Sequence, residues 1–197
     1  MPLVLARERS RVFLRCFFVP MVVAFALLVG FSPPAEADDD ARAAGGGGCR
    51  AHDAHLGVRR FARAVLCVQN RHRRAHGLRR LRASRGLRRA AARHARDMVR
   101  RNYFGHVSFG GRTVVDRVGR AGYGRRFAAG ENIFYALPPR PTPARVVAAW
   151  MASAGHRHQI LNGAWRDVGI GTVMRPPFRA RGGVTVVAVF GSRRAGR

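Results

Sequence analysis

Tyr103-Phe104-Gly105-His106 is the first of four short sequence patches that together decide the fold of this chain. The other three follow in a fixed order: Gly130-Glu131-Asn132-Ile133, then Trp150 with Gly155-His156-Arg157, and last Gly169-Ile170-Gly171. Each patch alone is short enough to occur by chance in many unrelated proteins. Four patches in order, spread over one domain of about 130 residues, are a far more specific signal.

This series resembles the CAP superfamily, which groups cysteine-rich secretory proteins, antigen 5 and pathogenesis-related 1 proteins. The resemblance covers Phe61 to Gly191 and is to the short bacterial secreted members of that family. It implies an α+β fold, a three-layer α-β-α sandwich with a small antiparallel sheet. Helical patterns before and between the β-rich runs agree with helices on both faces of a sheet. We therefore expect one CAP domain over residues 58–191, followed by a basic tail over residues 192–197.

Apolar periodicity and capping residues place the main elements. Apolar residues at steps of three and four predict helices over residues 58–76 and from about residue 84. Thr113 and Thr142 are expected to begin two more helices. Residues 131–135 predict a strand, and residues 167–174 and 184–190 predict an antiparallel hairpin. Gly169 and Gly171 are expected to let a strand pack closely against a helix.

The first 37 residues have the organisation of a secretory signal peptide. Four arginines precede an uncharged apolar run from Cys16 to Val29, and Ala35-Glu36-Ala37 offers small residues for cleavage. A membrane span needs about 20 apolar residues, so a retained anchor is the weaker alternative. Residues 38–57, rich in Gly, Ala and Asp, are expected to form a flexible leader. We expect a secreted protein, extracellular or associated with the cell wall, with no stable membrane span after cleavage.

Cleavage would leave Cys49 and Cys67 as the only cysteines. An even number of cysteines in an oxidising compartment predicts a disulfide between them. The alternative is two unpaired thiols.

Charge is the second global feature. The 37 basic residues are all Arg and face 10 acidic residues, which gives a formal net charge of +27; removing the signal segment with its four Arg and two Glu leaves +25. Such a surface attracts polyanions in a way that salt weakens. The alternative is that codon bias replaced Lys by Arg, although this does not explain the scarcity of acids.

The expected partners follow from this charge and from export. We expect an anionic cell-wall polymer, a lipid surface or an extracellular protein as the partner, and a monomeric domain. The sequence has no zinc finger, helix-turn-helix or aromatic-interleaved RNA-binding signature, so specific nucleic-acid recognition is not expected.

The resemblance further implies a shallow cleft where two His and two acidic side chains converge and can hold a divalent metal. The matching positions here are His106, Glu131 and His156. Imidazole nitrogen and carboxylate oxygen suit a zinc-like ion with one position open to water. The alternative is that these three side chains only hydrogen-bond to backbone and hold the loops.

Three neighbouring positions limit this metal hypothesis. Ser153 stands where many relatives have the second acid, so at most a three-ligand site is expected. Asp167 is expected to pair with an arginine, such as Arg166 or Arg157, instead of completing the cleft. His94 lies on the apolar stripe of a helix and is expected to be a hydrogen-bonded core residue.

Three function classes remain open at this stage, one of them a purely structural secreted protein that uses neither its cleft nor its basic surface. The favoured one is an extracellular binding module that uses its cleft and basic surface. The alternative is a metal-assisted hydrolase of peptide or ester bonds with Glu131 as the catalytic base. Binding is favoured because no Ser lies in a nucleophile-elbow setting and both cysteines are assigned to a bridge.

Overall fold

The computed structural model describes residues 48–193 of the 197-residue chain. Within this range the elements are α1 Val58–Ala75, β1 Arg82–Ala83, α2 Arg85–Arg101, α3 Val114–Arg120, β2 Phe127–Ala136, α4 Pro143–Ala152, α5 Ala154–Leu161, β3 Asp167–Val173 and β4 Val184–Arg193. The predicted signal peptide, the first part of the leader and the end of the basic tail lie outside the described residues. None of the helices in residues 48–193 is long and apolar enough to cross a membrane.

The strands form one four-stranded sheet in the order β1-β3-β4-β2. β4 pairs antiparallel with β3 on one side and with β2 on the other, so the predicted hairpin is confirmed. β1 adds two residues parallel to β3 and was not predicted, because a pair of residues is too short to show an alternating pattern. β2 is therefore an edge strand.

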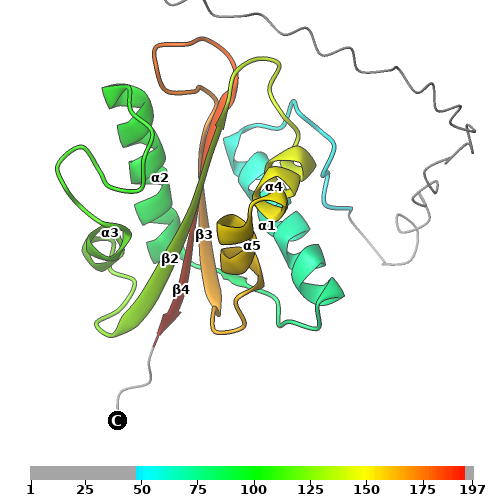
Figure 1. Cartoon of the computed structure of the whole chain (residues 1–197), viewed down its shortest axis with the longest axis vertical. Helices are drawn as coiled ribbons and strands as arrows, with labels where there is room; N and C mark the ends of the chain where they lie inside the picture. The colour runs from blue at the N-terminus through cyan, green and yellow to red at the C-terminus, as the bar shows by residue number, and fades with distance from the viewer. Residues whose placement is uncertain (1–47, 194–197) are drawn as a thin grey trace, which may run out of the picture. The chain divides into compact units, whose positions relative to one another are not determined.

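Helices cover both faces of this sheet (Figure 1), which confirms the three-layer α-β-α sandwich. α1, α4 and α5 lie on one face, where the core contains Phe61, Trp150 and Phe190. α2 and α3 lie on the other face, where Leu87 and Met98 pack against β4. Alternate residues of each strand therefore point into different cores.

Side-chain caps fix where three helices begin. The Ser84 hydroxyl accepts a hydrogen bond from the Leu87 amide at the start of α2. Thr113 and Asp116 form a reciprocal capping box at the start of α3. Thr142 caps α4, which has proline in its first turn. The predicted starts of these helices are confirmed, because each depends on local hydrogen bonds that the sequence itself encodes.

The folded domain begins earlier than predicted. Cys49, Ala51 and Leu56 are buried in the core beneath α1. Cys49 forms a disulfide with Cys67 of α1, which confirms the predicted bridge. The expectation of a flexible leader up to residue 57 is wrong for this last part, because the bridge and the buried Leu56 hold it against the domain.

Two glycines bring α2 onto the sheet. A Cβ atom at Gly169 would collide with the backbone of Leu87 and Arg88, and one at Gly171 with the backbone of Ala91 and Ala92. The predicted close packing of strand and helix is confirmed. It sets the middle of α2, including His94, directly above the sheet.

Candidate functional site

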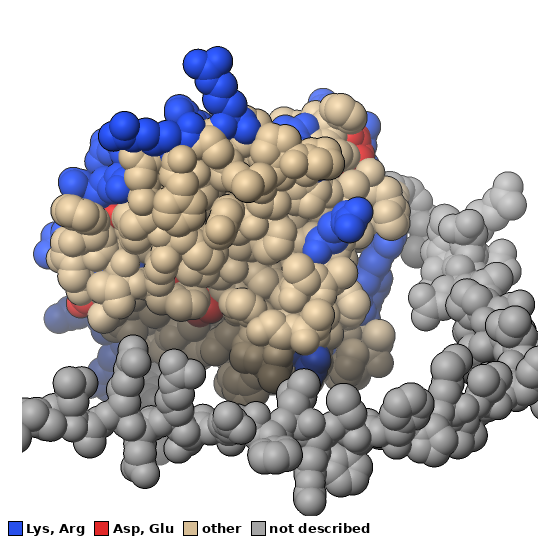
Figure 2. All heavy atoms as spheres, turned by 45° about the horizontal axis from the view of Figure 1, so that its top comes forward, with Lys and Arg blue, Asp and Glu red and all other residues tan. Residues whose placement is uncertain are grey.

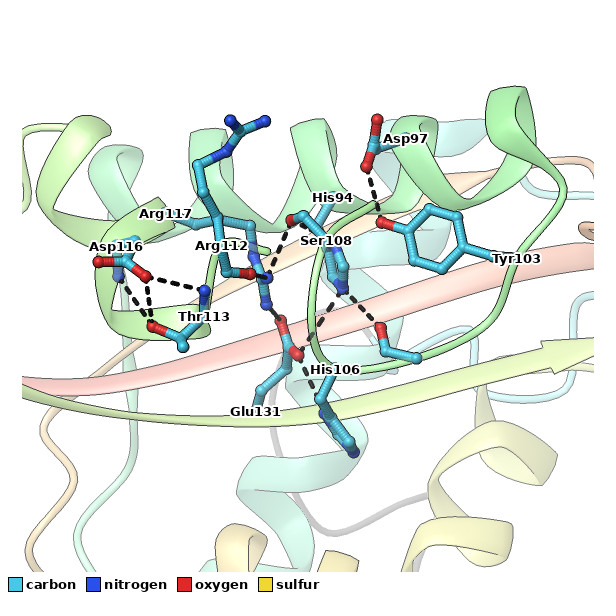
Figure 3. A network of polar contacts seen from close by, with 11 residues as sticks. His94, Asp97, Tyr103, His106, Ser108, Arg112, Thr113, Asp116, Arg117 and Glu131 are labelled. Carbon is cyan, nitrogen blue, oxygen red and sulfur yellow. Dashed lines mark hydrogen bonds and ion pairs between the residues drawn. The ribbon is translucent and has the colours of Figure 1, made fainter. Parts of the chain in front are cut away.

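Glu131 is the centre of a polar cluster on the edge strand β2. It lies opposite Val189 of β4, and its side chain is only 2% exposed on the face covered by α2 and α3. A buried carboxylate must be paired and hydrogen-bonded to be stable. Figure 3 shows its side chain pointing toward Arg117 and His106, with His94 and Ser108 close by.

Arg117 of α3 supplies the countercharge. Its Nη2 lies 2.7 Å from Oε2 of Glu131, and its side chain is 6% exposed. Its Nη1 donates to the Ser108 hydroxyl at 3.1 Å and to the Arg112 carbonyl at 2.8 Å. The guanidinium therefore joins α3, the loop after α2 and the edge strand.

His106 is the outward member of the cluster. Its Nδ1 lies 3.0 Å from Oε1 of Glu131, and its side chain is 56% exposed. Because a carboxylate only accepts hydrogen bonds, Nδ1 carries the proton in this pair. In the neutral ring this leaves Nε2 as an acceptor on an exposed side chain.

His94 lies beneath the cluster and is almost completely buried. Its Nε2 donates to the Gly105 carbonyl at 2.9 Å, and its Nδ1 lies 3.5 Å from the Ser108 hydroxyl. Burial lowers the pKa of His94; the nearby Glu131 charge partly opposes this effect and the Arg117 charge adds to it. These contacts are those of the hydrogen-bonded core histidine that was expected.

His156 is carried by the opposite layer. Its carbonyl on α5 accepts a hydrogen bond from Nδ2 of Asn132 at 2.9 Å. Asn132 follows Glu131 on β2, so the two side chains point to opposite faces of the sheet. Burial lowers the pKa of His156, and the charge of His106 adds to this effect.

The structure thus brings His106 and Glu131 together and holds His156 on another element. Within residues 48–193, no group of three or more His, Cys, Asp and Glu side chains is placed to hold a metal ion. The oxygens of Glu131 already face Arg117 and His106. As arranged here, the residues do not fit the three-ligand metal site that the family resemblance predicts.

Asp167 belongs to a different contact. Its carboxylate accepts from the Tyr123 hydroxyl at 2.8 Å and lies 3.4 Å from Nε of Arg82. Asp167 therefore pairs with an arginine, as expected, but the partner is Arg82 and not Arg166 or Arg157, because the unpredicted strand β1 places Arg82 directly beside Asp167.

Sequence reasoning missed Arg117 and Ser108 as members of the cluster. One signal pointed toward Arg117: Asp116 and Arg117 are neighbours on a helix and must serve different partners. Asp116 indeed bonds to Thr113, while Arg117 turns inward to Glu131. Nothing in the sequence identified which buried acid it would meet.

Comparison with known proteins identifies the family. The model of the cysteine-rich secretory protein family, CAP, matches residues 66–190. The chain belongs to this family. It is 34% identical over 116 residues to the uncharacterized protein YkwD of Bacillus subtilis, a match that covers 59% of this chain and 44% of YkwD. It is 35% identical over 107 residues to the uncharacterized membrane protein YlbC of the same organism, covering 54% of this chain and 30% of YlbC. The matches thus span less than half the length of either relative.

Solved structures agree on the fold. An extracellular protein containing an SCP domain from Bacillus anthracis superposes with a TM-score of 0.54 at 26% identity, covering 70% of this chain and 40% of that one. An outer surface protein from Borrelia burgdorferi superposes with a TM-score of 0.61 at 19% identity, covering 71% of this chain and 97% of that one. The second likeness, at its low identity, supports the fold alone.

Proposed function

We propose that this CAP domain is an extracellular binding module that engages an anionic cell-wall polymer or lipid surface through its arginines. Export of the protein is part of the proposal. It is supported by the signal-like N-terminal sequence and by the Bacillus anthracis SCP-domain protein described as extracellular.

One observation carries this proposal: the acids of the domain are already engaged. Residues 48–193 contain five acidic side chains, and each has a partner: Asp53, Asp97, Asp116, Glu131 and Asp167. Their arginine partners are Arg50, Arg82, Arg101 and Arg117. The other arginines of the described range form no ion pair within it. Apart from Arg73, which is buried and donates to backbone carbonyls, their charge is therefore uncompensated and available to an external anion.

The polar cluster also favours a binding module over a hydrolase in which Glu131 is the catalytic base. A general base must reach the proton that it removes. The Glu131 side chain is 2% exposed and is held by Arg117 and His106. Its geometry suits a structural link between β2, α3 and the loop after α2.

Salt-dependent sedimentation tests the proposal. The full chain should sediment with anionic cell-wall preparations or with vesicles of phosphatidylglycerol at low salt, and added salt should release it. Vesicles of neutral phosphatidylcholine are the control surface. Failure to sediment with any anionic preparation at low ionic strength would reject the proposal.

The alternative function is a hydrolase in which His106, in place of Glu131, is the catalytic base. His106 is exposed and donates Nδ1–H to a buried carboxylate, so its Nε2 is better placed than Glu131 to accept a proton. This alternative predicts turnover of a peptide or ester substrate that His106→Ala abolishes and that His158→Ala, at an exposed position on α5, retains. Equal turnover by the His106→Ala and His158→Ala variants would contradict the hydrolase alternative.

A further inference from the structure

We infer that an arginine-lined groove beside α2 is a binding site for a narrow phosphate-bearing polymer without bases, such as a phosphodiester or polyphosphate strand. The inference rests on the proposed function and gives it a location and a ligand class. The groove has a volume of about 1140 Å³. It adjoins the polar cluster through His94, Ser108 and Arg117.

The charge of the groove is almost entirely of one sign. Seven exposed arginines line it: Arg93, Arg96, Arg100, Arg112, Arg120, Arg175 and Arg179. Its single acid, Asp97, already accepts from the Tyr103 hydroxyl at 2.7 Å and from Nε of Arg101 at 3.0 Å. None of the seven guanidinium groups forms an ion pair or a side-chain hydrogen bond with another residue of the described range. They are therefore free to bind external anions.

Three elements place these arginines around the groove. Arg93, Arg96 and Arg100 are spaced by three and four residues, so they share one face of α2 and extend along it for about 10 Å. Arg112 and Arg120 come from the loop before α3 and from its end. Arg175 and Arg179 come from the connection between β3 and β4. In Figure 2, arginine side chains gather along the side of the molecule where α2 lies, while the face toward the viewer carries few charges.

The connection between β3 and β4, which carries Arg179 on one side of the groove, has an unusual backbone conformation. Phe178 and Arg179 are non-glycine residues with φ of 64° and 58°. The Arg179 amide donates to Oδ1 of Asn102 at 3.1 Å, and Asn102 is the left-handed C-cap of α2. Left-handed backbone at such residues persists only where surrounding contacts impose it. The connection is thus tied to the end of α2, so the groove exists before a ligand arrives.

The residues that line the groove favour a ligand that carries mainly hydrogen-bond acceptors. Arginine only donates hydrogen bonds, so a groove lined mainly by arginine satisfies phosphate oxygens. An acidic polypeptide would bring backbone N–H groups, for which this lining has few acceptors. No Phe, Tyr or Trp lines the groove, so it offers no platform for stacking nucleic-acid bases. A flat bilayer would touch only the rims of a concave site.

Matched charge removal on the two faces of the sheet tests the inference. Arg93→Gln, Arg96→Gln and Arg100→Gln are combined in the full chain to remove three charges from the groove. Arg59→Gln, Arg60→Gln and Arg63→Gln remove three exposed charges from α1, in the opposite layer. All six side chains are exposed, and circular dichroism checks that both variants fold. The probe is long-chain inorganic polyphosphate, titrated by calorimetry at constant salt.

The groove predicts that the α2 variant binds polyphosphate at least about tenfold more weakly than wild type, while the α1 variant changes by less than about threefold. Equal losses in the two variants would assign the affinity to overall charge and overturn the groove, while the proposed function would stand. Failure of wild type to bind polyphosphate, wall polymer and anionic vesicles alike would overturn both.

Three further titrations test the ligand class. Polyglutamate of equal charge, single-stranded DNA and phosphatidylglycerol vesicles are compared with polyphosphate at the same salt. Weaker binding of all three supports a base-free phosphate polymer. If one of these probes binds more tightly than polyphosphate and loses the same affinity in the α2 variant, the ligand assigned here is wrong. Tighter polyglutamate would indicate an acidic polypeptide, tighter DNA a nucleic acid, and tighter vesicles a lipid surface.

Discussion

The guanidinium of Arg117 and the carboxylate of Glu131 form a buried ion pair between α3 and β2, with Nη2 and Oε2 2.7 Å apart. The pair joins the helix layer that carries the arginine groove to the edge strand of the sheet. The position of the short helix α3 on the sheet therefore depends on this charge contact as well as on the buried Val118. Removing one partner would leave the other charged and buried.

Arg117→Met should lower the free energy of unfolding by about 3–5 kcal/mol, because it leaves the Glu131 carboxylate buried without its countercharge. Urea denaturation followed by circular dichroism measures the change. The double variant Arg117→Met/Glu131→Leu should lose less than Arg117→Met alone, because it removes both charges. A single variant as stable as wild type would contradict the structural role of the pair.

Gly171→Ala should destabilise the domain by about 1–3 kcal/mol, because the new methyl group meets the backbone of α2 at Ala91 and Ala92. Gly155→Ala is the matched control, since a Cβ there has no neighbour within 4 Å. It lies in α5 and should leave stability unchanged or raise it slightly. Thermal unfolding compares the two variants, and equal melting temperatures would argue against the close contact of β3 and α2.

His94 should make stability fall in mild acid. Its pKa is lowered in the folded domain, chiefly by burial, so below the unfolded value of about 6.5 the unfolded state binds the proton more readily. The contribution of His94 to the free energy of unfolding is therefore present in full above the unfolded pKa. It is lost as the pH falls from that value toward and through the lower folded pKa. His72 and His156 also have lowered pKa values and contribute in the same direction.

His94→Gln should reduce the difference in unfolding free energy between pH 7.5 and pH 5, whatever its effect on stability at pH 7.5. His55→Gln, at an exposed position before α1, is the control and should keep the wild-type difference. An unchanged pH dependence in His94→Gln would show that His94 is not a source of this acid sensitivity.

Metal content tests the arrangement of His106, Glu131 and His156. Because Glu131 faces Arg117 and His106 while His156 lies on the opposite layer, we expect no more zinc in the wild-type chain than in the His106→Ala/His156→Ala variant. Elemental analysis after dialysis against zinc makes the comparison. One zinc per chain in wild type, lost in the variant, would instead support the three-ligand site expected from the family resemblance.

The three-layer arrangement was expected from the family resemblance, whereas the helix starts were predictable because their determinants are local. Thr113, Thr142 and Ser84 fix helix starts through bonds to residues three positions away. Gly169 and Gly171 mark the close approach of strand and helix. The two-residue strand β1 was not predictable, since it is defined by the long-range pairing of Arg82 and Ala83 with Asp167 and Val168.

The site was predictable in part. His106 and Glu131 do lie together, as the family pattern implied. His156 lies on α5, in the layer on the other face of the sheet, and forms no metal-holding group with His106 and Glu131. The sequence did not say which face of the sheet α5 covers. The role of Arg117 depends on how α3 docks on the sheet, which no local pattern encodes.

The dependence of polyphosphate affinity on salt tests the central claim most directly. Because binding is assigned to uncompensated arginines, the logarithm of the association constant of the full chain should fall linearly with the logarithm of salt concentration, with a slope of roughly −0.7 for each phosphate neutralised. An affinity that stays the same from low to high salt would contradict the claim that these arginines make this CAP domain a binding module for anionic polymers.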